Sequence, residues 1–339
     1  MSNHKRPTQT DVARLAEVSQ TTVSYVLNNS EAVSVSPATR QRIWDAIDEL
    51  GYVPNQAARS LRTNRTFSIA SIIEDITNPF YPAFERGIQD VAEQNGYDLI
   101  IYSTRGIVEK ERKSLRSVQH NRVEGLIGIF SHLTIDDLRP LIQQNIAVVK
   151  AEAQHTDVGE LALDTFFVDN VVAARTAVNH LIQRGHTRIG MIGGPSAAPR
   201  DTRIVGYRQA LVQHHIPLEP SLFCDGDFSE SSGYKGMQRL LLLEPRPTAV
   251  FAANDLMAIG ALIAIKEAGL KIPEDVAVMG FDDIPTARLV SPPLTTIAHF
   301  PENLGRRAAE LLFERLNGTA PPHGRCVEMP YELIVRESA

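Results

Sequence analysis

Cysteine is scarce in this chain, and its scarcity excludes several kinds of site. The 339 residues contain two cysteines, Cys224 and Cys326, which stand far apart and without a second cluster of metal-ligating residues. Two such cysteines provide neither a disulfide framework nor a zinc site. We therefore expect no bound metal and no cofactor built on cysteine.

Long apolar runs are missing as well. No apolar stretch approaches the roughly 20 residues that a membrane-spanning helix needs. The first ten residues, MSNHKRPTQT, carry basic side chains but no apolar segment behind them, so we do not expect a secretion signal. A cytoplasmic protein with no membrane partner is the simplest interpretation.

The chain also lacks the common signatures of enzymes. It contains no dinucleotide fingerprint, no phosphate loop of the GxxxxGK type and no nucleophile elbow, and GMIGG does not have the glycine spacing that these motifs need. The adjacent His214 and His215 would point apart on a helix, which argues against a shared metal ion. We predict a protein that is not an enzyme.

Charge becomes informative only when it is divided along the chain. Residues 1–65 hold eight of the 34 Lys and Arg but only six of the 40 Asp and Glu, which gives a balance of +2 there and −8 in the rest. A length of 339 residues with 43% hydrophobic side chains suggests more than one folding unit. The sequence therefore predicts a mildly basic head on an acidic body.

The head opens with the pattern of a short amphipathic helix. A threonine cap at Thr8 or Thr10 precedes a set of apolar residues that would share one helical face: Val12, Ala13, Leu15 and Ala16. The pair Val18 and Ser19 then makes a turn. A short helix that ends in a tight turn is the first half of a helix-turn-helix.

A second helix follows from Gln20 to Leu27. Its apolar residues Val23, Val26 and Leu27 would face inward, and the side chains that would face outward are Gln20, Thr21, Ser24 and Tyr25. Such side chains suit a helix that reads base edges in the major groove. The hydroxyl of Thr22 can instead bond a carbonyl or a phosphate, so it carries less sequence information. A helical hairpin within an ordinary core is the competing interpretation.

A third helical pattern covers Thr39 to Leu50, with Ile43, Ala46 and Ile47 at the buried period and Gly51 as a stop signal. The sole tryptophan, Trp44, is expected in the core of the head or at its edge. Three such helices can bury a small shared core.

The residues then match a known family. The motifs DVARLAEVSQTTVSYVLNN, VSPATRQRI, DELGYVPN and AARSLRTNRT, followed by HLIQRGHTRIGMIGGP, AANDLMAIGAL, GFDDIP and PPLTTI, resemble the LacI/GalR transcription regulators in the expected order. The resemblance runs from about Thr8 to Arg336. It implies a head at 1–53, a hinge at 54–66 and an effector-binding, dimerising body at 67–339.

The resemblance implies a second DNA contact in the hinge. In the family this segment pairs with the hinge of a second subunit and wedges a leucine into the minor groove, which by position is Leu61. A flexible basic linker is the alternative. The predicted DNA contacts are Thr8, Ser19, Gln20, Thr21, Thr22, Ser24, Tyr25 and Asn28 in the head, and Asn55, Ala58, Arg59, Leu61 and Arg62 in the hinge. Tyr25 departs from the arginine common in the family, so the base pair facing it is not predicted.

In the body, buried strand-like runs alternate with helical patterns. The runs are FSIASII, DLIIY, VEGLIGIF, IAVVK, RIGMIG, TAVFA and VAVMGF. This alternation predicts parallel sheets covered on both faces. We expect two doubly wound lobes resembling periplasmic binding proteins, lobe one at about 67–166 plus 298–330 with a helix at Pro301 to Leu316, and lobe two at about 167–297.

Ligands of such sheets bind beyond the carboxyl ends of the strands. Together with the resemblance, this rule selects the predicted effector contacts: Asp75, Phe80, Tyr81, Lys150, Glu152, Arg203, Phe228, Asn254, Asp282 and His299. An arginine, an amide and carboxylates can satisfy several hydroxyls, and aromatic rings can stack on a sugar. Capping or surface roles are the alternative for the carboxylates, and Lys150 points either to an anionic effector or to a solvated strand end.

We interpret the chain as a homodimeric, effector-controlled DNA-binding regulator, most often a repressor in this family, that binds double-stranded operator DNA and associates with the nucleoid. The effector is expected to be a sugar or sugar derivative, with a non-sugar effector or a corepressor as the alternative. A ligand-binding protein without DNA function is a distant alternative. The chain stops soon after the last predicted strand, so no heptad tail for tetramer formation is expected.

Overall fold

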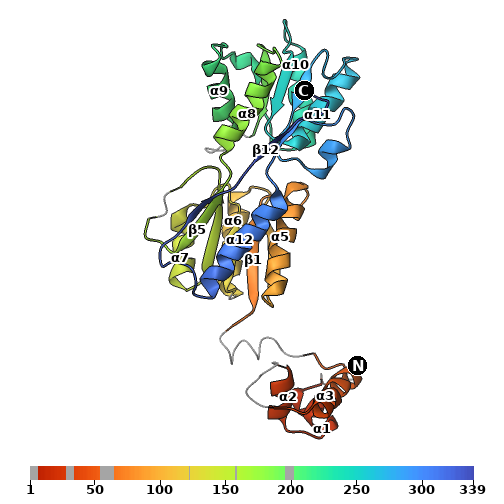
Figure 1. Cartoon of the computed structure of the whole chain (residues 1–339), viewed down its shortest axis with the longest axis vertical. Coiled ribbons are helices and arrows are strands. Elements are labelled where there is room, and N and C mark those ends of the chain that lie inside the picture. The colour runs from red at the N-terminus through yellow and green to blue at the C-terminus, as the bar shows by residue number, and fades with distance from the viewer. Residues whose placement is uncertain (1–6, 28–33, 54–64, 122, 157–158, 195–201) are drawn as a thin grey trace. The chain divides into compact units, whose positions relative to one another are not determined.

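The computed structural model describes residues 7–27, 34–53, 65–121, 123–156, 159–194 and 202–339 (Figure 1). The chain divides into two compact units, Met1–Thr66 and Phe67–Ala339, which we call the head and the body. Six of the predicted DNA contacts lie outside the described residues: Asn28, Asn55, Ala58, Arg59, Leu61 and Arg62.

The head contains three described helices, α1 (Gln9–Leu15), α2 (Gln20–Leu27) and α3 (Pro37–Leu50). Each begins at a hydroxyl side chain that accepts a backbone N–H. Thr8 forms a capping box with Asp11, Ser19 accepts the N–H of Thr22 at 3.1 Å, and Ser36 accepts that of Thr39 at 3.2 Å. Helix α3 ends at Gly51, whose φ of 58° lies in the left-handed region.

The three helices bury one small apolar core. Its members are Val12, Ala13, Ala16, Val23, Val26, Ile43, Ala46 and Ile47. The prediction for Leu15 was wrong, because its side chain is 43% exposed, and Trp44, expected in the core or at its edge, is not in the core, since it is 42% exposed. The buried stripe of α1 follows Val12 and Ala16, one turn apart, and leaves Leu15 at its edge. Trp44 lies on the outer face of α3, next to the buried Ile43.

Lobe one of the body is a six-stranded parallel sheet in the order β11-β5-β4-β3-β1-β2. Its strands are β1 (Ser68–Ile73), β2 (Asp98–Ser103), β3 (Gly125–Gly128), β4 (Ala147–Glu152), β5 (Leu163–Phe167) and β11 (Cys326–Glu328). Its helices are α5 (Phe80–Gln94), α6 (Val108–His120), α7 (Ile135–Gln143) and α12 (Pro301–Leu316).

Strand β1 contributes to two cores on opposite faces of this sheet. Ile69 and Ile73 pack into the cluster that contains residues of α5 and α12, whereas Ala70 and Ile72 pack into the cluster that contains residues of α6 and α7. Successive side chains of a strand point to opposite faces, so a continuous apolar run is what a doubly covered strand requires.

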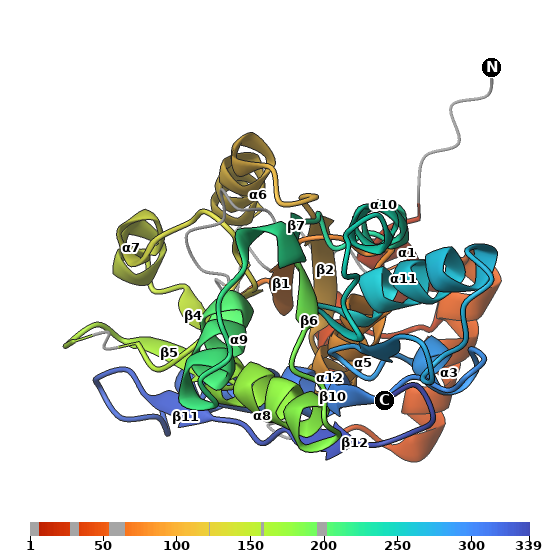
Figure 2. The ribbon, with the colours of Figure 1, turned by 90° about the horizontal axis from the view of Figure 1, so that it is seen from above.

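Lobe two repeats this architecture with four parallel strands in the order β7-β6-β8-β9. They are β6 (Ile189–Gly193), β7 (Phe223–Asp225), β8 (Ala249–Ala252) and β9 (Ala277–Met279). The helices are α8 (Asn170–Gln183), α9 (Thr202–Gln213), α10 (Glu230–Leu241) and α11 (Asp255–Glu267), with short 3-10 turns at Pro220–Leu222 and Pro285–Arg288. Helices α8 and α9 lie on one side of β6, and α10 and α11 lie on the other (Figure 2).

The chain passes from lobe to lobe more than once. It leaves lobe one after β5, returns through β10 (Thr296–Ala298) to α12 and β11, and then runs into β12 (Glu332–Ile334), which pairs antiparallel with β10. Its end is held in lobe two, where Ser338 Oγ donates to the carbonyl of Val278 at 2.6 Å. The two lobes are therefore connected at three places in the sequence.

The predicted fold class is confirmed: a helical head and an α/β body with parallel sheets. Helix α12 has the predicted bounds. The sequence runs did not predict β5, β7, β10, β11 and β12, most of which have only three residues. Within the described ranges, no helix is both long and apolar enough to cross a membrane.

The packing of α5 against α12 generates a stability prediction. A Cβ at Gly305 would overlap the backbone carbonyl of Phe84, which cannot move without shifting α5. Gly305→Ala should therefore lower the free energy of unfolding by about 1–3 kcal/mol, although alanine is the better helix former. Chemical denaturation measures this effect.

A matched control is Gly236→Ala in α10, where the nearest atoms to the added methyl belong to the side chain of Ile192, the first at 3.2 Å. The loss of unfolding free energy in Gly236→Ala should be clearly smaller than that in Gly305→Ala. Equal stabilities of the two variants would contradict the close helix contact.

Candidate functional site

The head presents two exposed hydrogen-bonding side chains at the start of α2. Gln20 and Thr21 are exposed, whereas Ser24 and Tyr25 are half-buried. Gln20 Nε2 reaches Gln9 Oε1 of α1 only at 3.5 Å, a weak contact that a base edge can replace. Gln20 and Thr21 are therefore the best placed of the predicted base-reading residues.

Three other predicted DNA contacts are engaged inside the head. The Thr8 hydroxyl donates to Asp11 Oδ2 at 2.6 Å, and the hydroxyls of Ser19 and Thr22 lie 2.8 Å apart. Ser19 is thus the cap of α2 rather than simply a turn residue. Any phosphate contact by these hydroxyls has to share them with the helix caps.

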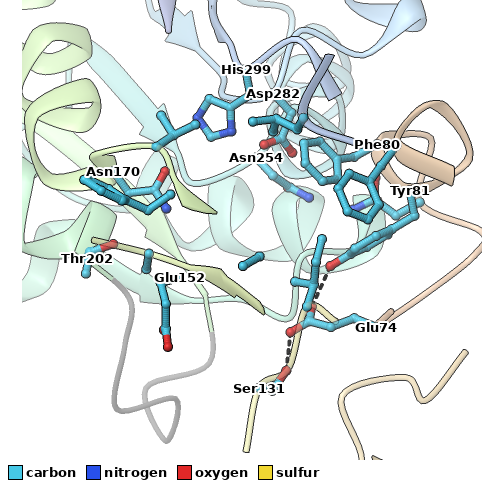
Figure 3. Close-up of a pocket in the computed structure, with 18 of the residues that line it drawn as sticks. Glu74, Phe80, Tyr81, Ser131, Glu152, Asn170, Thr202, Asn254, Asp282 and His299 are labelled. Atoms are coloured by element: carbon cyan, nitrogen blue, oxygen red, sulfur yellow. Dashed lines mark hydrogen bonds between the residues drawn. The ribbon is translucent and has the colours of Figure 1, made fainter. Parts of the chain in front are cut away.

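The body contains a cavity of about 250 Å³ whose walls come from both lobes (Figure 3). Aromatic side chains make much of the wall, and polar groups enter it at several points. The polar lining residues are Glu74, Asn78, Tyr81, Ser131, Glu152, Asn170, Thr202, Arg203, Asn254, Asp282 and His299. A small, largely apolar cavity with a few fixed polar groups is typical of a small-molecule site.

Among the lining residues that the structure describes, Arg203, on the first turn of α9, is the only arginine or lysine. Its guanidinium lies over the ring of Phe281, with 4.1 Å between Cζ and the ring centroid, and it donates to the carbonyl of Ala253. Its second nitrogen lies 3.6 Å from Asp282 Oδ1. The planar cation is therefore held in one orientation by an aromatic face, a carbonyl and a carboxylate.

Asn254 is almost completely buried and serves first as the cap of α11. Its Oδ1 accepts the N–H of Met257 at 2.9 Å, and its Nδ2 donates to the carbonyl of Phe228 at 2.9 Å. One amide hydrogen remains for a ligand. The side chain also ties the loop that carries Phe228 to the cavity wall.

Asp282 occupies an unusual backbone position, with a φ of 115°. Burial raises the pKa of its carboxyl to about 7, and the nearby Arg203 opposes this shift. A residue held in such a sparsely populated conformation marks a functional site when its surroundings fix it. Here the N–H of Asp282 donates to the carbonyl of Ile297 at 2.8 Å and fixes the turn.

His299 lines the cavity from the segment that crosses between the lobes. Burial lowers the pKa of His299 well below its usual value, and Arg203 adds to the effect, so the ring is neutral. It packs edge-on against Phe281 at 4.4 Å between ring centroids. Its Nε2 has no hydrogen-bond partner among the described residues, which leaves it for a ligand.

Lobe one contributes a polar cluster at the carboxyl ends of β1 and β3. Glu74 accepts hydrogen bonds from the Tyr81 hydroxyl at 3.1 Å and from the Ser131 hydroxyl, as Figure 3 shows. Burial, with a further contribution from Glu74, raises the pKa of Tyr81 well above its usual value. Tyr81 therefore stays a neutral hydrogen-bonding group at the cavity.

Comparison with known proteins decides the family. Residues 8–55 match the model of bacterial regulatory proteins of the lacI family, and residues 178–339 match that of a periplasmic binding protein-like domain. The HTH-type transcriptional repressor CytR of Escherichia coli K12 is 38% identical over 98% of this chain and 96% of its own. The chain belongs to the LacI family.

Solved structures of this family agree over the whole length. The lac repressor dimer bound to operator and the anti-inducer ONPF superposes with a TM-score of 0.83 at 29% identity, covering 98% of this chain and 99% of that one. A transcriptional regulator CelR–cellobiose complex gives 0.71 at 33% identity, covering 98% and 100%. The predicted function is confirmed: the chain is a LacI-family DNA-binding repressor controlled by a small-molecule effector.

The LacI-family chain brings most of the predicted effector contacts to the cavity. Eight of them line it: Phe80, Tyr81, Glu152, Arg203, Phe228, Asn254, Asp282 and His299. They come from sequence positions 80 to 299 and from both lobes. The cavity lies at the carboxyl ends of the parallel strands, which is where the rule placed these residues.

Two predicted contacts do not line the cavity. The carboxylate of Asp75 accepts the N–H of Thr77 at 3.0 Å and its hydroxyl at 2.8 Å, so it closes a turn. Lys150 is 1% exposed and pairs with Glu152, which itself reaches the cavity. Lys150 is therefore not a solvated strand end either, because its charge is neutralised inside the lobe.

Five polar lining residues are not among the predicted contacts: Glu74, Asn78, Ser131, Asn170 and Thr202. Glu74 and Ser131 follow β1 and β3, so the strand-end rule could have found them. Asn170 and Thr202 begin α8 and α9 instead. Asn170 Oδ1 is buried without a partner among the described residues, a feature that only the folded chain reveals.

The raised pKa of Asp282 generates a prediction about stability and pH. Because its folded pKa of about 7 lies above the ordinary value of 3.8, the folded body holds this proton over that interval and the unfolded chain does not. The free energy of unfolding should therefore fall as pH rises from about 4 to about 7, by at most about 4 kcal/mol from this group.

Asp282→Asn should flatten this part of the pH profile, measured by denaturation between pH 5 and pH 8. The control is Asp283→Asn, since Asp283 pairs with Arg336 at 2.6 Å and its side chain is 27% exposed. Asp283→Asn should lower the free energy of unfolding through loss of this ion pair, while the fall with rising pH that Asp282 causes should remain. An unchanged slope in Asp282→Asn would contradict the buried proton.

Proposed function

We propose that the chain is a homodimeric, cytoplasmic, nucleoid-associated repressor whose effector is a single-ring sugar or sugar derivative bound between the lobes. The observation that carries the effector class is the cavity itself. It combines Arg203, Asp282 and Asn254 with aromatic walls, a set that can satisfy several hydroxyls while a ring stacks on the apolar face of a sugar.

The cavity volume favours a small effector. About 250 Å³ lies below the range of about 300–1,000 Å³ for pockets that hold drug-sized ligands. One sugar ring suits this space better than two. The related CelR structure holds the disaccharide cellobiose, so this chain is proposed to differ from it in effector size.

Charge supports a neutral effector. Above its pKa of about 7, the carboxylate of Asp282 opposes the charge of Arg203, and the buried Lys150 opposes that of Glu152. An anionic effector would add an unbalanced charge to a mostly apolar cavity, which is costly. Hydroxyl groups can instead donate to the carboxylates and accept from Arg203 and from neutral His299.

A homodimer is supported by apolar exposure at the free edge of the lobe-one sheet. Strand β2 forms that edge, and its Ile101 is 42% exposed. Ile76, 41% exposed, is joined to the same strand because its N–H donates to Ser103 Oγ at 3.2 Å. An uncovered edge strand with exposed isoleucines is a surface that a second copy can cover.

The central experiment measures binding of the full chain to duplex DNA selected by the protein from a random library, at fixed salt. D-ribose, D-glucose and cellobiose are added one at a time. A monosaccharide that weakens binding identifies an inducer, and one that strengthens it identifies a corepressor. An effect of cellobiose alone, or of none of the three, would count against a single-ring sugar.

Base reading is tested on α2. Gln20→Ala or Thr21→Ala should relax preference at one position of the selected DNA and cost about 1–3 kcal/mol in specific binding, because each removes a hydrogen-bonding group from a base edge. The measurement is selection and sequencing of bound DNA. Gln41→Ala, an exposed polar residue of α3, is the control and should leave preference unchanged. Unaltered preference in both α2 variants would remove the reading role.

Effector binding is tested at Arg203. Arg203→Ala should abolish the response of DNA binding to the active sugar while operator affinity without sugar is retained, because the cation orients the ligand. Arg208→Ala, exposed on the same helix α9, is the matched control. A normal dose response in Arg203→Ala would place the effector elsewhere.

A further inference from the structure

The first residue of the body has an unusual conformation. Phe67 immediately follows the head and linker unit, and its φ is 51°, in the left-handed region that a residue with a Cβ avoids. Such a conformation persists only where neighbouring groups fix it. At Phe67 these groups come from distant parts of lobe one.

The Phe67 backbone is held on both sides: its carbonyl accepts the N–H of Asp98 at 2.9 Å, and its own N–H is held by a carboxylate. Glu124 Oε1 accepts the N–H of Phe67 at 2.8 Å, and Glu124 Oε2 accepts the Tyr97 hydroxyl at 2.7 Å. The ring of Phe67 packs on Tyr97 at 5.6 Å between centroids, and Tyr97 packs edge-on against Phe313 of α12 at 5.1 Å. We call Phe67, Tyr97, Glu124 and Phe313 the entry clamp.

Strands β1 and β3 connect the entry clamp to the effector cavity. Glu124 immediately precedes β3 and holds Phe67, which immediately precedes β1. At the other end of the same strands, Glu74 follows β1 and accepts the hydroxyl of Ser131, which follows β3. These parallel neighbours are thus cross-linked at both ends by a glutamate, and the seven residue steps from Phe67 to Glu74 place the two links about 23 Å apart.

Helix α12 makes a second connection. Leu304 near its start lines the cavity, and Phe313 nine residues later belongs to the entry clamp. Nine residues of helix span about 14 Å. The helix is also locked to α5, since Gly305 and Phe84 meet backbone to backbone. A change in the cavity wall can therefore reach Phe67 through rigid elements.

We propose that Glu124 and Tyr97 are positioning residues for operator binding, because they fix the backbone at the point where the body joins the DNA-binding part. The inference rests on the proposed function, in which the cavity holds the effector. The clamp touches neither DNA nor effector. It acts by fixing the direction in which the backbone leaves the body at Phe67. Strands β1 and β3 and helix α12 connect this position to the cavity.

The test uses the full chain with Tyr97→Phe, Glu124→Gln and the double variant. Tyr97→Phe removes only the hydroxyl and keeps the aromatic packing. Tyr102→Phe is the matched control, because its hydroxyl accepts Asn121 Nδ2 at 3.0 Å in the same lobe but outside the clamp. Binding is measured to the selected operator duplex and to a shuffled duplex of equal length and composition.

We expect each clamp variant to bind the operator about tenfold more weakly, with shuffled-duplex binding equal to that of Tyr102→Phe. The double variant should lose no more than either single variant, since both act through one carboxylate. A loss that is equal on both duplexes, or no loss on either, overturns the proposal. Thermal unfolding midpoints close to that of the control exclude a general loss of structure.

Trypsin cleavage after Arg65 separates this inference from the proposed function. Arg65 is exposed and lies two residues before Phe67. Loosening the clamp should speed cleavage there relative to Tyr102→Phe. If the unchanged protein fails to prefer operator over shuffled DNA, the operator role itself fails. If cleavage after Arg65 is the same in all variants, the clamp does not hold the chain and the inference is overturned whatever the DNA result.

Discussion

The body depends on one geometric constraint, which is that the strands of each lobe run parallel. Their carboxyl ends therefore meet at one edge of each sheet, and the residues that follow them converge without being close in sequence. Glu74 and Ser131 arrive in this way in lobe one, and Asn254 and Asp282 in lobe two. Reversing a single strand would move its terminal side chain to the far end of the lobe, so the cavity exists only because the topology is uniform.

The same convergence places charges in a poorly solvated space. Asp282 keeps its proton up to a pH of about 7, and Arg203 is oriented by an aromatic face and a carbonyl as well as by a carboxylate. Removing one member of a buried pair leaves the other uncompensated, which is why such groups are arranged together. The charged and polar groups of the cavity are thus in place before any ligand enters, and the donors and acceptors that a ligand could use already have fixed orientations.

The sequence predicted the elements that have long, regular patterns and missed what depends on exact position. Helix α12 and strands β1, β2 and β4 were found because their apolar patterns extend over many residues. From the sequence, Asp75 was selected instead of its neighbour Glu74. Successive side chains at a strand end point to opposite sides, so an error of one residue selects a side chain that points away from the cavity. From the sequence, Lys150 had two alternative roles, as a contact for an anionic effector or as a solvated strand end. Its ion pair with Glu152 is recognisable only when both side chains are placed on one face of β4. Asn170, whose Oδ1 has no partner among the described residues, gave no sequence signal at all.

Half of the chain's 12 phenylalanines line the cavity: Phe80, Phe84, Phe130, Phe166, Phe167 and Phe228. Phe80 and Phe228 are only half-buried, so covering them with a ligand removes apolar surface from water, and that removal carries a negative heat-capacity change. The enthalpy of effector binding must then become more favourable as temperature rises, while its entropy becomes less so. Repression by this chain is consequently a function of temperature as well as of effector concentration, through the aromatic lining alone.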